Sequence, residues 1–475
     1  MHRLNGEDSG FLAMEGPLQA MNTMAVAILK NPAGGSTSIT LDDLRAHIAS
    51  RLDQLPSFRW RIVPTPFGLH HPLCVRDPQF DLDFHLREIT LEEDETLDER
   101  FALLAEKHLD RRHPLWQATL IHIPTDGSQA IVIKYHHALA DGVGARTIFE
   151  RVFSDAERQA IPDEALPWTP EQIPSAPMLI VMALLAHLRS LLQLPSLAIR
   201  TALGAKKVKA RQDAAKVEVP KFSGAAPNTV INRAFSPRRS YARAELPLDE
   251  LRRVKDLAGT TLNDVILAVI GGAAIRYLED YGEVPDLPLL ASVPVSYEPA
   301  DAPLRQAGNK FWSFTTTLAT NVADPAGRLR HISAVTAEAK AQLDLLGPEL
   351  LPAWLDHVPP LISGPGARAM VTRLAELGPN DLVDANILVS NIRGPSQPWQ
   401  VLGADVVDLY IDGPPSNGVG WNVMLWSYAD RILIGVLAFR DSLEDPTALS
   451  SHIEASFREL VSAVEHSSAQ PSGTA

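Results

Sequence analysis

The sequence predicts an α/β or α+β fold made of two units of similar size. Its 475 residues exceed what one ordinary core holds, since domains usually have roughly 100–200 residues. The hydrophobic share of 45% and the charged share of 21% are typical of a globular protein and exclude a disordered one. Strand-like and helix-like segments alternate in both halves, and a stretch of different composition separates them, which indicates sheets with flanking helices.

The first unit is expected to cover residues 1–160. Short apolar runs predict its strands, and longer runs with capping residues predict its helices. Thr40 is expected to cap a helix that begins at Leu41. The other expected elements are strands at Met24–Leu29, Ala118–Ile123 and Ala130–Tyr135, and helices at Leu97–Leu109 and Gly144–Ala156.

Residues 161–230 are expected to form a linker. Prolines at 162, 167, 170, 174 and 177 predict an irregular start. The apolar stretch Met178–Leu203 follows, but His187, Arg189 and Pro195 interrupt it. Because a spanning helix needs about 20 apolar residues in a row, we expect either a helix on a membrane surface or one packed on the body. The basic run Lys206–Arg211 comes next and could meet phosphates, anionic lipid headgroups or only solvent.

The second unit is expected to cover residues 231–466, and a flexible tail residues 467–475. Thr260 or Thr261 is expected to cap a long helix at Leu262–Leu278. The expected strands lie at Arg243–Leu246, Leu289–Val293, Ile387–Val389 and Ile432–Phe439.

Charge and cysteine content exclude several classes of protein. Lys and Arg number 43 against 57 Asp and Glu, a net charge of −14, which argues against nucleic acid as a partner. Cys74 is the only cysteine, so an internal disulfide and a cysteine-based zinc site are excluded. The polar N-terminus lacks the apolar core of a secretory signal. We therefore expect a cytoplasmic protein.

The segment His136–Gly142, HHALADG, is the strongest candidate for a chemical site. It follows an expected strand, in which successive side chains point to opposite faces, so His136 and His137 should not share one metal ion. Asp141 precedes an expected helix and can cap it or pair with an arginine from elsewhere, which makes it a structural clamp rather than a base. Gly142 or Gly144 is expected to supply a positive φ in the turn.

This segment resembles the HHxxxDG motif of the coenzyme A-dependent acyltransferase superfamily. Other segments resemble the bacterial wax ester synthase/diacylglycerol acyltransferase family, in the family's order and over nearly the whole chain. They are Arg3–Leu12, His113–Trp116, Thr261–Ala268, Ser292–Ser296 with Gly308-Asn309, Ser390–Pro395 and Gly420–Tyr428. Two departures stand out: Arg393 occupies a position that is often proline, and Met21–Met24 replaces a segment that more usually carries a histidine.

The resemblance implies two chloramphenicol acetyltransferase-like domains with the active site at their interface. It implies acyl transfer from acyl-CoA to diacylglycerol or a long-chain alcohol, with acyl-CoA as a substrate and no cofactor or metal. His137 would be the general base and His136 a supporting residue. Asn263, Asp264 and Asn391 would contact substrate or hold a helix end, and Pro114, Leu115 and Trp116 would line the acceptor site or belong to the core.

Two other functions remain open on the sequence. A condensation-type enzyme would take the acyl group from a carrier protein, and a lipid-binding relative would keep the fold without turnover. Contact with the inner membrane or with lipid inclusions is compatible with each, and the oligomeric state is open.

Overall fold

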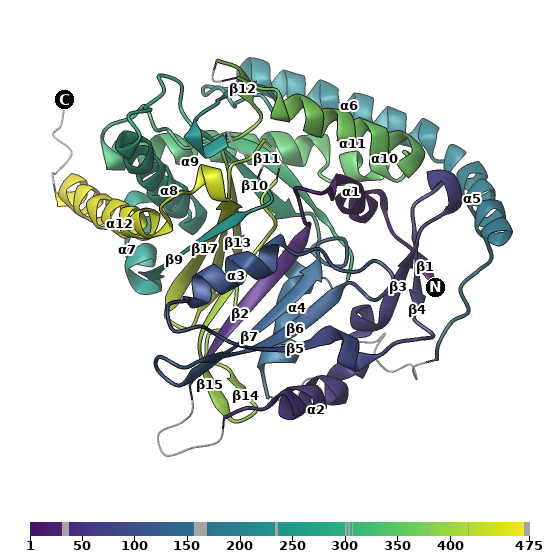
Figure 1. Ribbon diagram of the computed structural model, residues 1–475. Helices are drawn as coiled ribbons and strands as arrows, with labels where there is room; N and C mark the ends of the chain where they lie inside the picture. Colours follow the sequence, from purple (N-terminus) through teal and green to yellow (C-terminus); the bar gives the residue numbers. More distant parts are fainter. Residues whose placement is uncertain are drawn as a thin grey trace.

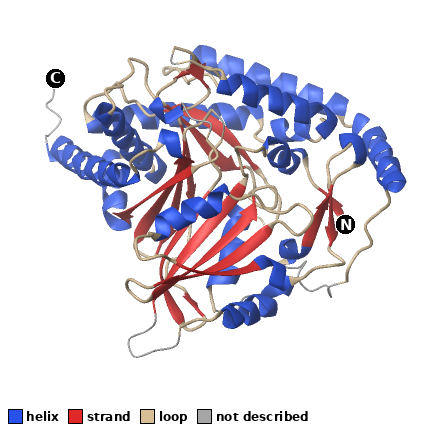
Figure 2. Ribbon diagram, in the orientation of Figure 1, coloured by secondary structure: helices blue, strands red, loops and turns tan. Residues whose placement is uncertain are grey.

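Two six-stranded sheets form the centre of the molecule (Figures 1 and 2). The computed structural model describes residues 1–30, 38–155, 169–232, 236–299, 302, 305, 307–378, 380–416 and 418–469. The predicted mixed α/β architecture is confirmed.

The first sheet has the order β14-β15-β2-β7-β6-β5. Its strands are β2 (Asn22–Lys30), β5 (Leu86–Thr90), β6 (Trp116–Ile123), β7 (Ser128–His136), β14 (Gln400–Val401) and β15 (Ala404–Asp412). Neighbouring strands pair antiparallel, except that β5 and β6 are parallel. The central strands β2 and β7 are buried along nearly their whole length, as their continuous apolar runs predict.

The second sheet has the order β11-β10-β13-β16-β17-β9. Its strands are β9 (Arg239–Pro247), β10 (Leu290–Ser296), β11 (Phe311–Thr317), β13 (Ile387–Ile392), β16 (Trp421–Tyr428) and β17 (Arg431–Phe439). Two smaller sheets join β1 (His2–Arg3), β4 (Leu73–Arg76) and β3 (Trp60–Val63), and β12 (Leu382–Val383) with β8 (Ala226–Pro227).

Strand β15 crosses from the second half of the chain into the first sheet. It pairs antiparallel with β2, with Met24 opposite Asp412 and Lys30 opposite Asp405. It also packs against β16 and β17 of the second sheet. The two halves are therefore joined by a shared strand, and the predicted domain limits at 160 and 231 stay a prediction about folding units.

Helices surround the two large sheets, some of them beside the second sheet and others along the top and right of the molecule (Figure 2). Those of the first half are α1 (Gly6–Met14), α2 (Leu41–Arg51), α3 (Leu97–Glu106) and α4 (Gly142–Phe153). The later ones are α5 (Ala176–Leu191), α6 (Leu194–Ala214), α7 (Leu248–Ala258), α8 (Leu262–Asp280), α9 (Pro325–Leu346), α10 (Leu350–Leu355), α11 (Pro360–Ala375) and α12 (Pro446–Ala469). Helices α8, α9 and α12 pack on one another beside the second sheet.

Capping residues start the helices where the sequence predicts them. Thr40 caps α2 and Thr261 caps α8, each in a capping box with the aspartate three residues later. The helix α12 extends to Ala469, so the expected tail begins later than 467, and residues 470–475 lie outside the described ranges.

The apolar stretch of the linker forms two helices rather than one. Helices α5 and α6 meet at a 49° bend next to Pro195, since proline cannot continue a preceding helix. Among the described residues, no single helix is long and apolar enough to cross a membrane. Two bent pairs, α5 with α6 and α7 with α8, meet that requirement only when taken together.

Candidate active site

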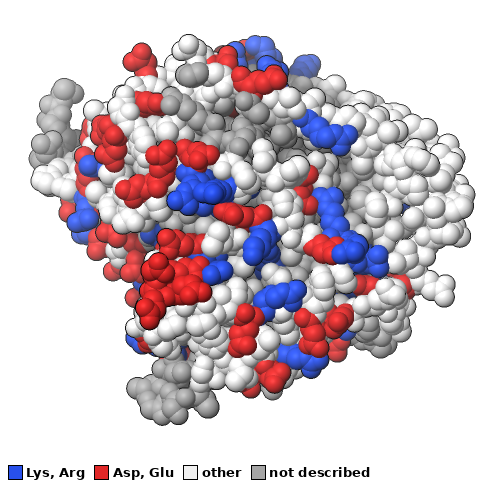
Figure 3. All heavy atoms as spheres, in the orientation of Figure 1, with Lys and Arg blue, Asp and Glu red and all other residues white. Residues whose placement is uncertain are grey.

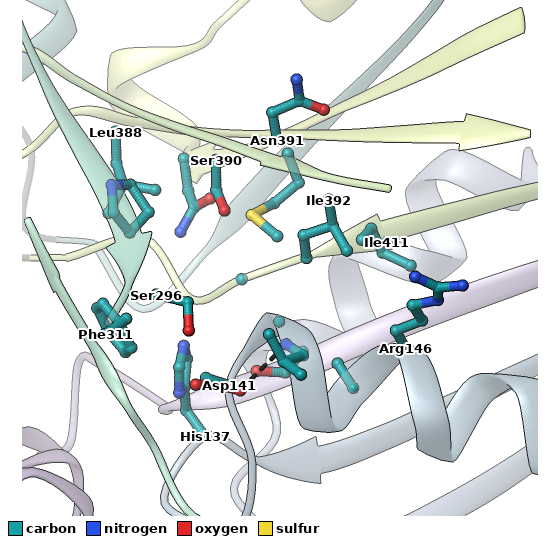
Figure 4. Close-up of a pocket in the computed structure, with 18 of the residues that line it drawn as sticks. His137, Asp141, Arg146, Ser296, Phe311, Leu388, Ser390, Asn391, Ile392 and Ile411 are labelled. Atoms are coloured by element: carbon teal, nitrogen blue, oxygen red, sulfur yellow. Dashed lines mark hydrogen bonds between the residues drawn. The ribbon is translucent and has the colours of Figure 1, made fainter. Parts of the chain in front are cut away.

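A cavity of about 330 Å³ lies between the two halves, and His137 is in its wall (Figure 4). The first half lines it from α1, β2 and α4, and the second half from β10, β11, β13 and β16. Its wall is mostly apolar and includes Phe11, Phe311, Leu388, Ile392 and Met424. Such a wall suits an apolar ligand and excludes water from a reaction.

His137 immediately follows β7, and its ring is held in one orientation. The ring stacks on Phe11 with 4.1 Å between centroids and 15° between planes. Its Nδ1 is buried without a hydrogen-bond partner among the described residues, and the ring lies beside Ser296 in the cavity wall (Figure 4). Burial lowers the pKa of His137 to about 4, and the imidazole is therefore neutral near pH 7 and able to accept a proton.

The backbone of His137 is held by the second half of the chain. The side-chain Nδ2 of Asn309 donates to the carbonyl of His137 at 2.9 Å and to Oδ1 of Asp8 at 2.7 Å. The backbone N–H of Asn309 also donates to Asp8, at 2.8 Å. Burial raises the pKa of Asp8 to about 7. Asn309 is fully buried, so removing its amide would take a donor from two buried groups of the first half, Asp8 and the carbonyl of His137.

Asp141 connects the two halves through its two carboxylate oxygens. Oδ1 accepts from the backbone N–H groups of Val143 and Gly144 at 3.0 and 3.1 Å and so caps α4. Oδ2 accepts from the guanidinium of Arg305 and from the backbone N–H of Lys310, the latter at 2.9 Å. Both alternatives that the sequence offered for Asp141, a cap and an arginine partner, are present at once.

The expectation of a positive φ at Gly142 or Gly144 is wrong. Neither residue has one, and Gly142 is the first residue of α4. A Cβ at Gly142 would lie 2.7 Å from Cδ1 of Ile392 on β13. The missing side chain thus gives room for a strand of the other half beside the helix start.

His136 lies outside this cavity. Its side chain is fully buried, with Nε2 3.6 Å from Oε1 of Glu15, and its Nδ1 accepts from the N–H of Ala138 at 3.0 Å. Burial lowers the pKa of His136 as well. The two imidazoles have separate surroundings, and within the described ranges no group of three His, Cys, Asp or Glu side chains could hold a metal ion.

The segment Pro114–Trp116 supports the histidine pair from the core. The carbonyl of Leu115 accepts from the N–H of His136 at 3.0 Å. Trp116 stacks between Phe58 and His85 and donates from Nε1 to the carbonyl of Phe58 at 2.7 Å. None of the three residues lines the cavity, so in this structure they are core residues.

The remaining candidates divide between the cavity and a helix end. Asn391 lines the cavity, but its amide points away from His137 (Figure 4). Asn263 and Asp264 do not line it. Asp264 is buried in the capping box of α8 and accepts from the hydroxyl of Ser333 at 3.1 Å, which agrees with the expectation that this pair holds a helix end.

Sequence reasoning missed Asp8, Arg305 and Lys310 as neighbours of the site, and it did not select Asn309. Asp8 and Asn309 lie in two of the segments that carry the family resemblance, and that was the available signal. Nothing local to Arg305 predicts its contact with Asp141, because the two residues are far apart in the sequence.

Comparison with known proteins identifies the family of the chain. Residues 4–266 match the wax ester synthase/diacylglycerol acyltransferase catalytic domain, and residues 307–461 match the C-terminal domain of the same family. A putative diacylglycerol O-acyltransferase of Mycobacterium tuberculosis H37Rv is 34% identical over 469 residues, which cover 97% of this chain and 96% of the relative. A second one from the same strain is 32% identical over 479 residues, covering 98% of each chain.

The same fold occurs in solved structures. The wax ester synthase/diacylglycerol acyltransferase from Marinobacter aquaeolei VT8 superposes with a TM-score of 0.66 at 24% identity, covering 98% of this chain and 100% of that one. The X-domain from teicoplanin biosynthesis superposes with a TM-score of 0.53 at 13% identity, covering 98% and 95%. With both family domains matched in order, the chain belongs to the wax ester synthase/diacylglycerol acyltransferase family and is an acyltransferase.

Proposed function

We propose that the protein transfers an acyl group from acyl-CoA to the hydroxyl of diacylglycerol, of a long-chain alcohol, or of both. The observation that carries this proposal is the neutral His137, whose ring lies in the wall of a mostly apolar cavity between the halves. A hydroxyl attacks a thioester slowly unless a base removes its proton, and a positioned base contributes roughly 10²–10⁴-fold in rate. The names of the relatives support the substrate classes.

In the proposed reaction, His137 Nε2 takes the proton of the acceptor hydroxyl as its oxygen attacks the thioester carbonyl. The carbon–sulfur bond then breaks, and the imidazolium returns its proton to the leaving thiolate. No acyl-enzyme forms, and acyl-CoA is a substrate, so no cofactor is required. We further propose that Asn391 contacts substrate, since it is the candidate amide that lines the cavity.

The donor and acceptor are tested by release of free thiol. Palmitoyl-CoA with dioleoylglycerol or hexadecanol should give turnover, and the ratio of the two rates measures acceptor preference. Turnover with an acyl-carrier protein but with no acyl-CoA would replace this proposal with a condensation-type enzyme. Absence of turnover with every donor, in a protein that binds lipid, would instead indicate a relative without catalysis.

We also propose that α5 rests on a lipid surface that supplies the acceptor, at the inner membrane or a lipid inclusion. Most of this helix faces outward, since only Leu179 and Ala183 are buried. The helix belongs to the broad uncharged area at the right of Figure 3. Its outward apolar side chains, each at least half exposed, are Met178, Val181, Leu184, Leu185, Leu188 and Leu191. Patches of this kind on a soluble fold usually mark an interaction site.

The basic run on α6 contributes less than its sequence suggests. Arg211 donates twice to Glu338, and Lys209 pairs with Asp213 at 2.6 Å.

Replacing Leu184 and Leu188 by Ser should lower cosedimentation with vesicles of phosphatidylcholine and dioleoylglycerol by severalfold. Leu257→Ser, at an exposed leucine of α7, is the matched control. Equal binding of all three proteins would rule out this surface.

A further inference from the structure

A second, more polar cavity adjoins the one that contains His137. It has a volume of about 1200 Å³ and is lined by the outer turns of α4, by residues 393–400 and by the start of β15. Arg146 and Arg393 line both cavities. These two arginines therefore stand at the junction between an apolar inner chamber and a polar outer one.

The two guanidinium groups come from opposite halves and have no counter-ion. Arg146 lies on α4, one turn after Gly142, and Arg393 directly follows β13. Among the described residues, neither makes a hydrogen bond or an ion pair to a protein group. Arg393 is exposed and Arg146 partly buried, and two positive charges in the wall of the same cavity favour a bound anion.

The acidic residues of the outer chamber are engaged elsewhere. Asp155 accepts from the N–H of Gly403 at 3.1 Å, and Asp405 accepts from the amide of Gln400 at 2.7 Å. Glu150 also has a partner. The third arginine of this chamber, Arg431, pairs with Glu245 and Asp408. The fourth acidic residue, Asp430, lies 3.9 Å from Arg431. Arg146 and Arg393, at the inner end, are the arginines of this lining with which no described residue forms an ion pair.

We propose that Arg146 and Arg393 bind the phosphate at the end of the phosphopantetheine arm of the acyl donor. Guanidinium groups match phosphate oxygens in charge and in geometry. The thioester would then reach His137 through the inner chamber. The part of the donor on the far side of the phosphate, a nucleotide or a carrier protein, would lie in or beyond the outer chamber. The inference rests on the proposed function, because it assumes a thioester donor. Coenzyme A and a carrier protein both supply this phosphate.

The test compares palmitoyl-CoA with palmitoyl-pantetheine, which lacks the phosphate and the nucleotide beyond it. Palmitoyl-4′-phosphopantetheine, which keeps the phosphate without the nucleotide, should respond to the substitutions as palmitoyl-CoA does. The variant Arg146→Gln/Arg393→Gln should raise KM for palmitoyl-CoA by about tenfold or more, since hydrogen bonds to charged groups are among the stronger ones. It should change kcat less than twofold and leave KM for palmitoyl-pantetheine, which lacks the phosphate, within twofold. Arg330→Gln, at an exposed arginine of α9, should alter neither constant.

An equal rise in KM for palmitoyl-CoA and palmitoyl-pantetheine, or no rise in KM for palmitoyl-CoA, would overturn the proposal. A palmitoyl-carrier protein serves as a further donor: if the wild type prefers it and the double variant loses that preference, the phosphate site stands and its source is the carrier. Calorimetry with free CoA and with pantetheine separates this inference from the proposed function. An inactive wild type that binds CoA more than tenfold better than the variant does would refute the function alone, and equal CoA affinities would refute the phosphate site.

Discussion

The two halves of the molecule contain similar six-stranded sheets but contribute differently to the site. The first half supplies the proposed base, His137, and the cap of α4, Asp141, from a single short segment, His136–Gly142. The second half supplies Arg305, Asn309 and Lys310, which hold that segment in place from one loop region. The difference teaches that the chemistry is local in the sequence, whereas the positioning of the reacting atoms is long-range.

The largest expected effect is that of removing His137, the proposed base in the first half. His137→Ala should lower kcat by about 10²-fold or more while the protein stays folded, because it removes the base and none of the contacts between the halves. Steady-state kinetics with circular dichroism of the purified variant measures both. A variant that keeps more than a tenth of the wild-type kcat would show that the first half does not supply the base.

The next effect concerns the connection between the halves. Asp141→Ala removes the cap of α4 and leaves the guanidinium of Arg305 without one of its partners, so it should cost about 3 kcal/mol of unfolding free energy. Asp324→Ala is the matched control: Asp324 also caps a helix, α9, but is exposed, and about 1 kcal/mol is expected. Urea unfolding of the two variants measures the contrast. Equal losses would mean that the contact across the halves adds nothing.

A smaller effect is expected for the residue that holds the backbone of His137. Asn309→Ala leaves Asp8 and the carbonyl of His137 without their shared donor, so we expect about a tenfold fall in kcat with KM changed less than twofold. Asn228→Ala removes a comparable contact, to the carbonyl of Gly378, and should leave kcat unchanged. An unaltered kcat in the Asn309 variant would confine the second half to lining the cavity.

The smallest effect is expected from pH. Since burial lowers the pKa of His137 to about 4, the base stays neutral down to that pH, and kcat at pH 5.5 should be within twofold of kcat at pH 6.5. A histidine with the ordinary pKa of about 6.5 would lose about fivefold over this interval. Burial also raises the pKa of Glu7 to about 8 and that of Asp8 to about 7, so the comparison is made below pH 6.5. A half-maximal rate near pH 6.5 would contradict a buried base.

The same division explains what the sequence could predict. Strands β2, β6 and β7, the caps at Thr40 and Thr261 and the placement of His137 follow from local patterns, which contiguous residues carry. The partner of Asp141 was predicted as a type, an arginine, but not as Arg305, since no local pattern connects distant loops. The positive φ expected at Gly142 failed because the constraint comes from Ile392 of the other half.

Other features of the site could be recognised only in the folded structure. For Pro114–Trp116 the sequence left both the acceptor site and the core open. None of the three lines the cavity, because whether an apolar side chain lines a cavity or fills the core depends on the sheet behind it. Arg393 was noticed only as a departure from a family pattern. Its convergence with Arg146 becomes visible once β13 is placed beside α4.

Strand β15 also bears on how the chain is made in the cell. The ribosome synthesises four strands of the first sheet, β2, β5, β6 and β7, long before residues 404–412. Until β15 is made, β2 has an unpaired edge, which is a template for association with other chains. A fragment that stops ahead of β15 would emerge with that edge open and is expected to aggregate. We therefore expect nascent chains of this protein to need rapid completion of synthesis, or chaperones, to keep the first half monomeric until β15 is made.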